Sequence, residues 1–577
     1  MITPSYTPTE EQRKVIEHSG SAFVTACPGA GKTRTMVERA RILFGESADK
    51  RGIAFLSFTN AAVEELEARL RAFGVLPIPL FPSFVGTFDR FLWQFFVVPF
   101  GIQGCTATPR LIPDKDDWQV VPFDGAQPLP LKCFDRATGM VDAVLAKEHG
   151  FDVSDPKRSI SRHEARALAI INGAHSNGQV DFEDVRVSVH ERLSDAAFAE
   201  RLGAIIATRF REIFVDEAQD CNPADLHIVA WLRKAGIAVK VICDPNQSIY
   251  AFRGGVTNQL LAFGETFPEA DRLTMSGNFR SPPAICLAIV ALRLPSARSN
   301  PDRPLGRHKG DSTPIHILSY KGTSPTSAIG REFKMLVQGL GIPLHEAPVV
   351  AATRASGARA IGQPPPRNTE HKTLLLAEAV TNYHFAFAVG NRRDALVRLH
   401  RTVLLIQGHI EAQGDYHAYV TAHSLEDGSW RPGVIEIASG LRFDALEPED
   451  EWLQKARRLL SSGLAAGLSI NQRLKKHADI AAVLVGAPTD SPPARTIHSV
   501  KGMEFPAVCV VMTSQKVGKI LDLLEGQRSE ADEDARKIYV GASRAERLLA
   551  FAVPKSSAGR LIALLQANGC TTVLNEI

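Results

Sequence analysis

Near the start of the chain, glycines, a lysine and a threonine follow an apolar run in a spacing that could bind a phosphate. The run Ser21–Ala26 leads into Ala26-Cys27-Pro28-Gly29-Ala30-Gly31-Lys32-Thr33, and a helical pattern continues to about Gly45. This approximates the phosphate-binding loop G-x₄-G-K-[ST], with Ala26 in place of the leading glycine. Backbone N–H groups and the helix N-terminus would hold the phosphates, Lys32 would reach the terminal ones, and Thr33 would ligate Mg²⁺. A capped helix after a tight turn is the plainer alternative, which the preceding strand disfavours.

A pair of carboxylates follows another apolar run far downstream. Glu212–Val215 ends in Asp216-Glu217-Ala218-Gln219-Asp220. An aspartate at the end of a buried strand is where a P-loop ATPase holds Mg²⁺, and the adjacent Glu217 could accept a proton from an attacking water. Acidic runs are usually exposed loops, which is the alternative interpretation. The apolar strand that runs directly into these carboxylates favours a hydrolytic site.

Such apolar runs recur along the chain, each followed by a polar or glycine-rich turn and a helical pattern. Their length and β-branched content are typical of buried parallel strands joined by helical crossovers, so we predict an α/β fold. The predicted strands are Ser21–Ala26, Gly52–Phe58, Glu212–Val215, Ala238–Cys243, Pro348–Thr353, Ala481–Val485 and Pro506–Met512. In open sheets of this kind ligands bind beyond the carboxyl ends of the strands, so chemistry is expected in the residues that follow each run.

Two long stretches interrupt the alternation. Residues from about Pro99 to Ala207 mix loops with helical patterns such as Ser161–Gly173. The stretch from about Gly362 to Asp490 opens with turn-forming residues and is then largely helical. We predict that both are inserted, mostly α-helical subdomains.

The composition is that of a globular protein without bulk charge. Of 577 residues, 45% are apolar, and 66 basic against 63 acidic residues leave a net charge of +3. A histone-like polycation is therefore excluded, and basic groups that face nucleic acid would have to be arranged locally. None of the eight cysteines forms a C-x₂-C pair, which argues against zinc ribbons and ferredoxin-type clusters. The N-terminus lacks a secretory apolar region and the richest apolar stretch, Phe91–Ile102, is too short to span a bilayer, so we expect a cytoplasmic protein.

Further segments follow in an order that is hard to obtain by chance. They are Tyr6–Gln12, Phe58–Ala62, Gly86–Phe88, Asp244–Gly255, Asn278–Ser281, Thr496–Phe505 and Tyr539–Ala545. With the phosphate loop and Asp216–Asp220 they extend over nearly the whole chain. In these segments the chain resembles superfamily 1 helicases of the UvrD/Rep/PcrA type, whose motifs Q and I to VI they match in sequence order.

The resemblance implies two RecA-like P-loop NTPase domains with two mostly α-helical insertions. The implied domains are 1A at 1–98 and 208–270, 1B at 99–207, 2A at 271–363 and 481–577, and 2B at 364–480. The distance along the chain between Arg280 and Lys501 is shorter than in full-size relatives, and their Gly-Gly-x-x-Phe signature is missing. We therefore expect a reduced or divergent 2B, and we do not transfer the autoinhibition, duplex engagement or partner binding that 2B governs in relatives.

ATP and Mg²⁺ are the implied cofactors. In the family pattern Gln12 would read the adenine edge, Arg34 would lie beside the base and ribose, and Phe279 would stack on the adenine. Glu504 of motif V would also belong to the nucleotide site. The implied catalytic residues are Lys32, Asp216, Glu217, Gln247, Arg280 and Arg544. Gln247 would sense the γ-phosphate, and the two arginines, which come from the second domain, would stabilise charge developing on it and tie cleft closure to the nucleotide state.

Single-stranded DNA is the implied substrate. Rings could stack on bases, each contributing about 1–3 kcal/mol regardless of sequence, and polar side chains could position phosphates. The candidates are Phe58, Thr59, Asn60, Thr87, Phe88, Tyr250, Phe252 and His498. The alternative for any phenylalanine is a core position, since the chain has 29 of them.

Besides Ala26, three residues depart from the family pattern. Asp89 stands where relatives commonly carry His, and a carboxylate there would repel a DNA phosphate. Phe252 replaces a common Trp, and Phe279 replaces a usual Tyr, so both keep a ring for stacking.

The function that the resemblance implies is an ATP-dependent DNA helicase and translocase of 3′→5′ polarity, acting on single-stranded and tailed duplex DNA in repair, replication or defence. The alternative, which the divergent 2B keeps open, is a DNA-stimulated ATPase that senses DNA and regulates a partner nuclease in an anti-phage system, with little unwinding. A P-loop metabolic kinase does not account for motifs III to VI. Residues 545–577 leave no room for a fused nuclease domain, so a nuclease or repair protein would be a separate partner, and no membrane is expected.

Overall fold

The computed structural model divides into two compact units, Met1–Asn278 and Phe279–Ile577, each described here by itself. It describes residues 7–45, 49–76, 78–112, 115–123, 126–155, 158–249, 257–363, 371–388, 393–411, 415–425, 427–443, 448–484, 491–528 and 533–577.

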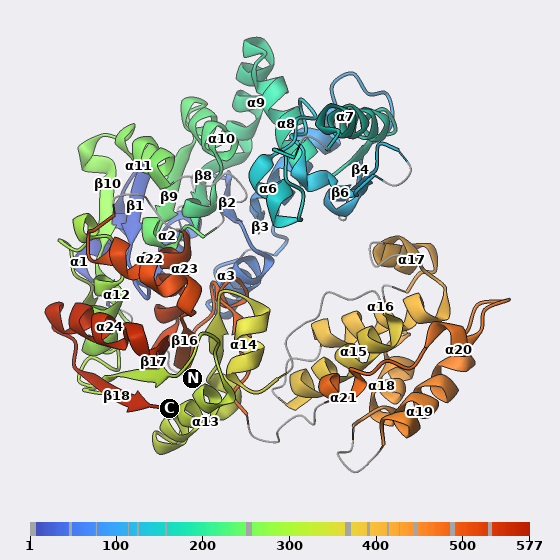
Figure 1. Ribbon diagram of the computed structural model, residues 1–577. Coiled ribbons are helices and arrows are strands. Elements are labelled where there is room, and N and C mark those ends of the chain that lie inside the picture. The colour runs from blue at the N-terminus through green and yellow to red at the C-terminus, as the bar shows by residue number, and fades with distance from the viewer. Residues whose placement is uncertain are drawn as a thin grey trace. The chain divides into compact units, whose positions relative to one another are not determined.

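The first unit is built on a six-stranded parallel sheet. The strands, in the order in which they are hydrogen-bonded, are β10 (Arg272–Met275), β1 (Ala22–Ala26), β9 (Ala238–Cys243), β8 (Phe210–Val215), β2 (Gly52–Ser57) and β3 (Phe84–Thr87). Their labels follow one another in this order across Figure 1. Four of the predicted strands are thereby confirmed in this sheet. The register aligns Thr25 of β1 with Cys243 of β9, which places the ends of these two strands side by side.

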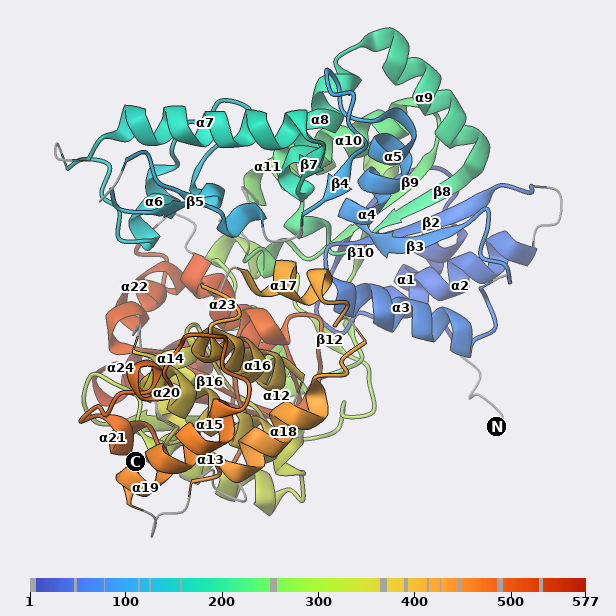
Figure 2. The same cartoon turned by 90° about the vertical axis from the view of Figure 1, so that its right-hand side faces the viewer.

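Helices cover both faces of this sheet because alternate strand residues point to opposite sides. One face carries α1 (Glu10–Glu17), α2 (Lys32–Gly45) and α3 (Asn60–Ala72), which pack on Val24 and Phe55. On the other face, Phe23 and Phe84 contact a second core. The helices of that core are α4 (Phe88–Leu92), α8 (Phe182–Leu193), α9 (Ala196–Arg209), α10 (Pro223–Lys234) and α11 (Thr257–Glu265). Figure 2 shows α1 to α3 and α4 with α10 on opposite sides of the strands.

One predicted boundary is wrong. We assigned 271–363 to the second domain, but β10 pairs in parallel with β1, with Arg272 opposite Phe23. The chain therefore stays in the first sheet until Met275. This strand carries a short, half-exposed mixture of residues, so it gives no buried apolar run by which the sequence could reveal it.

The first inserted stretch forms a small core of its own before it returns to the sheet. This part contains α6 (Ala143–Glu148), α7 (Ile160–Ser176) and the short strands β4 (Arg110–Leu111), β5 (Gln119–Val120), β6 (Leu129–Pro130) and β7 (Gln179–Val180). Phe151 and Ile171 are buried in its core, whereas α8 and α9, later in the same stretch, pack in the core beside the sheet.

The second unit has a six-stranded parallel sheet as well. Its strands, in order, are β15 (Ala494–Thr496), β14 (Val349–Ala351), β16 (Phe505–Val511), β17 (Ala545–Pro554), β13 (Ile315–Tyr320) and β18 (Thr572–Glu576). The helices that pack on it are α12 (Pro283–Ala291), α13 (Ser327–Gly339), α14 (Arg354–Ala360), α22 (Ser514–Leu524), α23 (Glu533–Ala542) and α24 (Lys555–Ala567). Two parallel sheets flanked by helices confirm the predicted α/β class with two RecA-like domains.

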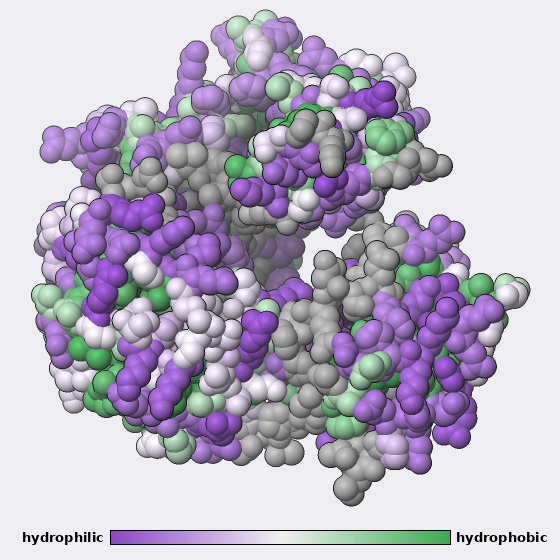
Figure 3. All heavy atoms as spheres, viewed as in Figure 1, coloured by the Kyte–Doolittle hydropathy of each residue, from purple (hydrophilic) through white to green (hydrophobic). Residues whose placement is uncertain are grey.

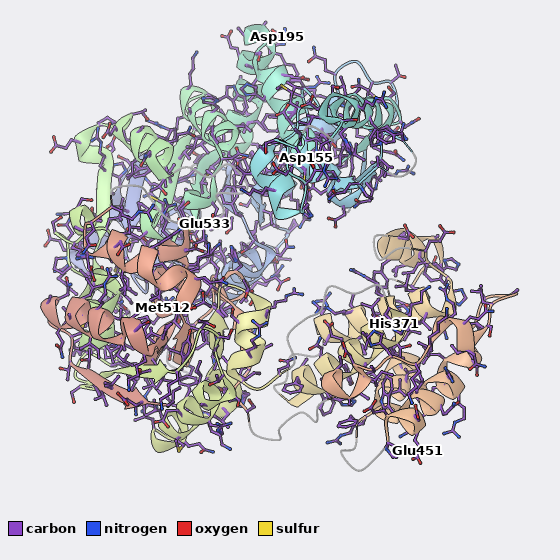
Figure 4. All side chains as sticks on the ribbon, in the orientation of Figure 1. Asp155, Asp195, His371, Glu451, Met512 and Glu533 are labelled. Atoms are coloured by element: carbon purple, nitrogen blue, oxygen red, sulfur yellow. The ribbon has the colours of Figure 1, made fainter. Side chains whose placement is uncertain are left out.

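The stretch expected to be divergent 2B is helical in the part that the structure describes. Its helices are α15 (Lys372–Ala388), α16 (Arg393–Gln407), α17 (Tyr416–Ala422), α18 (Arg431–Gly440), α19 (Glu449–Ser461), α20 (Ile470–Arg473) and α21 (Ile480–Val483). They enclose a separate core around Trp452, which is fully buried. Glu451, labelled in Figure 4, lies on the exposed side of α19, and Figure 3 shows a mainly hydrophilic surface over α18 and α19.

The strand predicted at Ala481–Val485 is wrong: the described residues of this run begin within the helix α21. Ile480, Val483 and Leu484 are buried in the helical core around Trp452. A short apolar run fits a buried helical turn as well as a buried strand, and here the surrounding helices decide. Among the described residues, no helix is both long enough and apolar enough to cross a bilayer.

Candidate functional site

The strand order of the first sheet brings the predicted nucleotide residues together. β1, β9 and β8 are neighbours, and because they are parallel their carboxyl ends lie at one edge of the sheet. The loop 27–31 follows β1, Asp244 follows β9, and Asp216 follows β8. β2 and β3 continue the same row, so Phe58 and Phe88 follow the next strands along that edge.

The loop after β1 has the backbone of a phosphate cradle. Gly29 and Gly31 have φ values of 71° and 75°, a backbone conformation that residues with a side chain rarely adopt. A Cβ at Gly31 would also lie 3.0 Å from the Gln12 amide nitrogen, so the position is restricted twice. The N-terminus of α2, a helix of 14 residues, begins at Lys32 directly after the loop. Unpaired N–H groups at a helix N-terminus favour an anion, so this geometry fits the phosphates of a nucleotide.

Lys32 and Glu217 begin a chain of hydrogen bonds across this edge. Lys32 Nζ lies 2.9 Å from Glu217 Oε1, with both side chains largely buried. Burial disfavours the charge on Lys32, but the carboxylates of Glu217 and Asp216 outweigh that effect and raise the pKa of Lys32. Glu217 has a φ of 55°, an uncommon left-handed backbone conformation for a residue with a side chain. The strained backbone and the ion pair thus coincide at the expected general base.

Gln219 extends this chain to the strand β9. Its Nε2 donates to Glu217 Oε2, and its Oε1 accepts from the backbone N–H of Asp244 at 3.0 Å. Asp244 Oδ2 in turn accepts from Gln247 Nε2 at 2.8 Å. Lys32, Glu217 and Gln247, predicted from three separate motifs, are therefore joined through two residues, Gln219 and Asp244, to which the sequence interpretation gave no role.

Asp216 and Thr33 fit the expected Mg²⁺ site. Asp216 directly follows β8 and is 7% exposed, and its carboxylate accepts from the Glu217 N–H at 2.9 Å. Burial raises its pKa to about 7, although Lys32 opposes the shift. A divalent cation would reverse this by favouring the ionised carboxylate. Thr33 supplies a hydroxyl in the first turn of α2, and Mg²⁺ bound with a nucleotide characteristically takes one or two protein ligands and completes its shell with phosphate oxygens and water.

Gln12 and Arg34, the two residues expected near the base, have different partners in the first unit. Gln12 is 2% exposed, and its Nε2 donates to Ala30 O at 2.9 Å. Its side chain also completes a capping box with Thr9 at the start of α1. Arg34 pairs with Glu38 at 2.8 Å, and its guanidinium lies 4.0 Å from the centre of the Phe73 ring. Gln12 therefore contacts the loop directly, whereas the Arg34 side chain contacts Glu38 of α2 and Phe73 at the end of α3.

The second unit gathers its predicted residues at the amino ends of two neighbouring strands. Glu504 precedes β16 and Arg544 precedes β17, and Phe505 N donates to Arg544 O at 2.9 Å. Arg280 pairs with Glu504 at 2.5 Å and donates to Ser543 O at 2.6 Å. Arg544 Nη2 donates to Ser543 Oγ at 2.9 Å. Both arginines therefore meet at Ser543, which the sequence interpretation did not single out.

Arg544 also serves the end of a helix in this structure. It is 3% exposed, and its Nε donates to Val540 O at 3.1 Å, which satisfies a carbonyl in the last turn of α23. Phe279, the expected adenine-stacking ring, is half-buried, and its backbone packs so tightly on Gly306 that a Cβ there would lie 1.9 Å from Phe279 O. The chain entering this unit is thus closely held beside Arg280.

The prediction that Phe88 stacks on DNA bases is wrong. Phe88 is fully buried, and its ring stacks on Phe58 at 5.3 Å between centroids. Phe58 is half-buried and keeps part of its surface open. The Gly-Thr-Phe motif could not reveal that Phe88 is buried, because its burial depends on α8, which packs on α4 from a distant part of the sequence. Tyr250 and Phe252 lie outside the described residues.

The polar DNA candidates occupy helix starts. Thr59 caps α3 by accepting from Ala62 N at 3.2 Å, and Thr87 caps α4 by accepting from Arg90 N at 3.1 Å. Asn60 is exposed in the first turn of α3. His498 is half-buried after β15 in the second unit. The N-terminus of α3, a helix of 13 residues, is suited to phosphate contact at this sheet edge.

Asp89, which departs from the family pattern, has a partner within the first unit. Its carboxylate pairs with Arg186 of α8, which also binds Asp225 at 3.0 Å and Glu183 at 3.1 Å. The Arg186 side chain is 9% exposed, and these carboxylates raise its pKa against the effect of burial. Asp89 is therefore held by an ion pair within the first unit, and because Glu183 and Asp225 share the same guanidinium its charge is only partly offset.

Comparison with known proteins places the chain in a family. Residues 8–104 and 145–268 match the model of the UvrD/REP helicase N-terminal domain, and residues 489–556 match the UvrD-like helicase C-terminal domain. The chain belongs to the UvrD/Rep/PcrA family of superfamily 1 helicases. The matched ranges contain the phosphate loop, both carboxylates and Arg544.

Curated relatives match over different shares of the chain. "ATP-dependent DNA helicase UvrD2" of Mycobacterium tuberculosis is 25% identical over 595 residues, covering 96% of this chain and 79% of the relative. "ATP-dependent DNA helicase srs2" of Schizosaccharomyces pombe is 23% identical and covers 57% of this chain and 39% of its own length. "ATP-dependent DNA helicase PcrA" of Staphylococcus epidermidis is 23% identical, with 47% and 38% covered. Residues 269–488, which contain the helices α15 to α21, lie outside both family models.

Two signals in the sequence could have found the residues that were missed. Gln219 stands two residues after Glu217 in a segment where a buried strand has just ended, so a polar side chain there had to find a partner. Ser543 lies directly before Arg544 at a helix end, where hydroxyls commonly bind neighbouring backbone or side chains.

Proposed function

We propose that the protein is an ATP-dependent DNA helicase that translocates 3′→5′ on single-stranded DNA and unwinds tailed duplex DNA. The observation that carries the proposal is the hydrogen-bonded chain Lys32–Glu217–Gln219–Asp244–Gln247, which joins three family motifs beside a glycine cradle. The names of the relatives agree with it, since each is called an ATP-dependent DNA helicase.

Nucleotide entry would rearrange this chain in a defined way. A terminal phosphate would draw Lys32 Nζ away from Glu217 Oε1 and so free that oxygen to take the proton of an attacking water. Gln219 would still hold Oε2 and keep the carboxylate oriented. Bound Mg²⁺, ligated by Thr33 and Asp216, would supply neutralising charge at the phosphate oxygens. Gln219 is thus proposed to position the general base while Lys32 changes partner.

The arginines of the second unit supply the other half of the proposed reaction. Arg280 and Arg544 are held together at Ser543, so both guanidinium groups could act on the same γ-phosphate. Each would have to leave a partner in its own unit, Glu504 for Arg280 and the Val540 carbonyl for Arg544. Exchange of these contacts for a phosphate would couple hydrolysis to the position of the second unit, which is the basis of proposed movement along DNA.

A second candidate is a DNA-stimulated ATPase that senses DNA and regulates a separate nuclease in defence, with little unwinding. The observation in its favour is that residues 269–488 lie outside the family models and hold a helical core of their own. The partner, whether a nuclease or a repair protein, would recognise this divergent region.

Unwinding of matched 3′-tailed and 5′-tailed duplexes with ATP and Mg²⁺ tests both candidates, with Lys32→Ala as the inactive control. We expect unwinding of the 3′-tailed duplex alone and ATP hydrolysis that rises on addition of single-stranded DNA. Stimulated hydrolysis without strand separation on either duplex would favour the sensor. ATP hydrolysis at the same rate with and without DNA would overturn both the helicase and the sensor proposals.

A further inference from the structure

The first turn of α1 connects the phosphate loop to the segment that leaves the first sheet. The Glu11 carboxylate accepts from Ser276 twice, from the backbone N at 2.7 Å and from Oγ at 2.9 Å. The next residue, Gln12, donates to Ala30 O of the loop at 2.9 Å. Hydrogen bonds to a carboxylate are roughly twice as strong as neutral ones, so the Glu11–Ser276 contact is the firmer of the two.

These contacts close into a ring. Cys27, at the start of the phosphate loop, donates its backbone N–H to Met275 O at 3.0 Å, and Met275 adjoins Ser276. The ring therefore runs from the loop through Gln12 and Glu11 to Ser276 and back through Met275. A displacement of the loop or of Gln12 can therefore pass through this ring to Ser276.

The opposite end of α1 is fixed to the body of the unit. Arg39 donates to Ile16 O at 3.1 Å and is itself held by Glu212 at 2.8 Å. Lys240, which is fully buried, donates to His18 O at 2.9 Å. The helix is thus anchored at its C-terminus, so only its first turn is placed to respond to the nucleotide.

The segment held by Glu11 leads directly to the residues expected on the nucleotide in the second unit. Phe279 and Arg280 follow Ser276 after two intervening residues along the chain. We propose that Glu11 is a positioning residue that couples nucleotide binding at Gln12 and the phosphate loop to the placement of Phe279 and Arg280. This rests on the nucleotide site of the proposed function and adds a device that transmits its occupancy through the chain rather than across a cleft.

Hydrogen exchange of the peptide that contains 272–281, with and without Mg²⁺ and the non-hydrolysable analogue AMP-PNP, tests the coupling. In the unaltered protein the analogue should slow exchange in this peptide. Glu11→Ala should reduce that slowing about tenfold, the effect of losing hydrogen bonds to a charged group, and Ser276→Ala should reduce it less because its backbone N–H remains. Ser276→Thr keeps both the backbone N–H and a hydroxyl donor, so the analogue should slow exchange in this variant as much as in the unaltered protein.

Glu10→Ala is the matched control, since the neighbouring Glu10 makes an exposed pair with Lys14 at 3.1 Å. It should behave as the unaltered protein does. In steady state, Glu11→Ala should lower kcat for ATP about tenfold with a smaller change in KM, with rates expressed per nucleotide-binding site titrated with AMP-PNP, because loss of folded protein would also lower the apparent kcat.

The proposal is overturned if Glu11→Ala and Ser276→Ala keep the full nucleotide-dependent slowing, or if the unaltered protein binds the analogue and shows none. Should Glu11→Ala fail to fold, Ser276→Ala and Ser276→Thr still decide. The exchange measurement needs nucleotide binding alone, so a protein that binds nucleotide but does not unwind DNA would refute the proposed function and leave this test intact.

Discussion

The two sheets hold their polar residues at opposite ends of their strands. In the first unit the phosphate loop, Asp216 and Asp244 follow β1, β8 and β9, at the carboxyl edge. In the second unit Glu504 and Arg544 precede β16 and β17, at the amino edge, where Arg544 binds a carbonyl at the end of α23. The difference matches the charges involved, because helix N-termini favour phosphate whereas helix C-termini favour a cation. One edge is therefore built to bind an anion, and the other to store guanidinium groups that an anion could attract.

The largest effect is expected from replacing Arg544, which tests whether the amino edge of the second sheet acts in hydrolysis. Arg544→Ala should lower kcat for ATP by about 10³–10⁵, the contribution typical of an arginine that stabilises a transferring phosphoryl group, with a much smaller change in ATP affinity. Arg544→Lys, which keeps the charge but not the planar fork, should recover only part of the rate. Steady-state hydrolysis and nucleotide titration measure the two effects. A loss confined to affinity would mean that the amino edge binds nucleotide rather than acting on the transition state.

Glu217→Gln tests the carboxyl edge in the same terms. The amide has one acceptor oxygen, so it can keep the contact from Lys32 or the one from Gln219 but not both, and it cannot take a proton; kcat should therefore fall by about 10²–10⁴ while ATP binding persists. Glu67→Gln is the control, since that carboxylate only pairs with Arg71 on the surface of α3 at 2.6 Å. Near-normal turnover in Glu217→Gln would show that another group activates the water.

The carboxyl edge was largely predictable from the sequence, and the amino edge was not. A buried strand, a glycine turn and a helix form a local pattern, so the phosphate loop and the Asp216–Glu217 pair could be placed from the residues themselves. Arg544 lies at a helix end before a strand, which resembles ordinary helix capping, and only the family resemblance pointed to it. Its meeting with Arg280 at Ser543 depends on how β17 and α12 pack, which no local pattern contains.

The errors have the same origin in tertiary context. Phe88 carries a ring at the expected position, but it is buried in the core where α8 packs on α4, whereas the neighbouring Phe58 is only half-buried. The run at 481–485 has the composition of a strand, but its residues 481–483 lie in α21 because the surrounding elements are helices. The sequence predicts that Asp89 repels a DNA phosphate, and it does not reveal that Arg186, about a hundred positions away, pairs with this carboxylate and offsets part of its charge.

A smaller effect should follow from Gln219→Leu. The substitution removes the bond that orients Glu217 and the one that Asp244 donates, but it leaves the general base in place. Loss of a hydrogen bond to a charged group costs about 1.5–3 kcal/mol, so kcat should fall about 10- to 150-fold. Gln219→Asn keeps the amide on a shorter side chain, so its kcat should lie between those of Gln219→Leu and the unaltered protein. A loss as large as that of Glu217→Gln would assign Gln219 a direct part in the chemistry, and no loss would show that the general base needs no such support.

The smallest effect is expected at the far end of the same carboxyl edge, where β2 leads to Phe58. If this part of the row serves DNA, Phe58→Ala should weaken single-stranded DNA binding by about 1 kcal/mol, the lower end for a stacked base because the ring is half-buried. Fluorescence anisotropy with a labelled oligonucleotide measures the change, and Phe58→Tyr, which keeps the ring, should bind as the unaltered protein does. A weakened DNA affinity with no comparable change in KM for ATP would divide the edge into a nucleotide part at β1, β9 and β8 and a DNA part at β2 and β3. Equal DNA affinity in Phe58→Ala would instead make Phe58 and Phe88 a packed pair that closes the core beneath that edge.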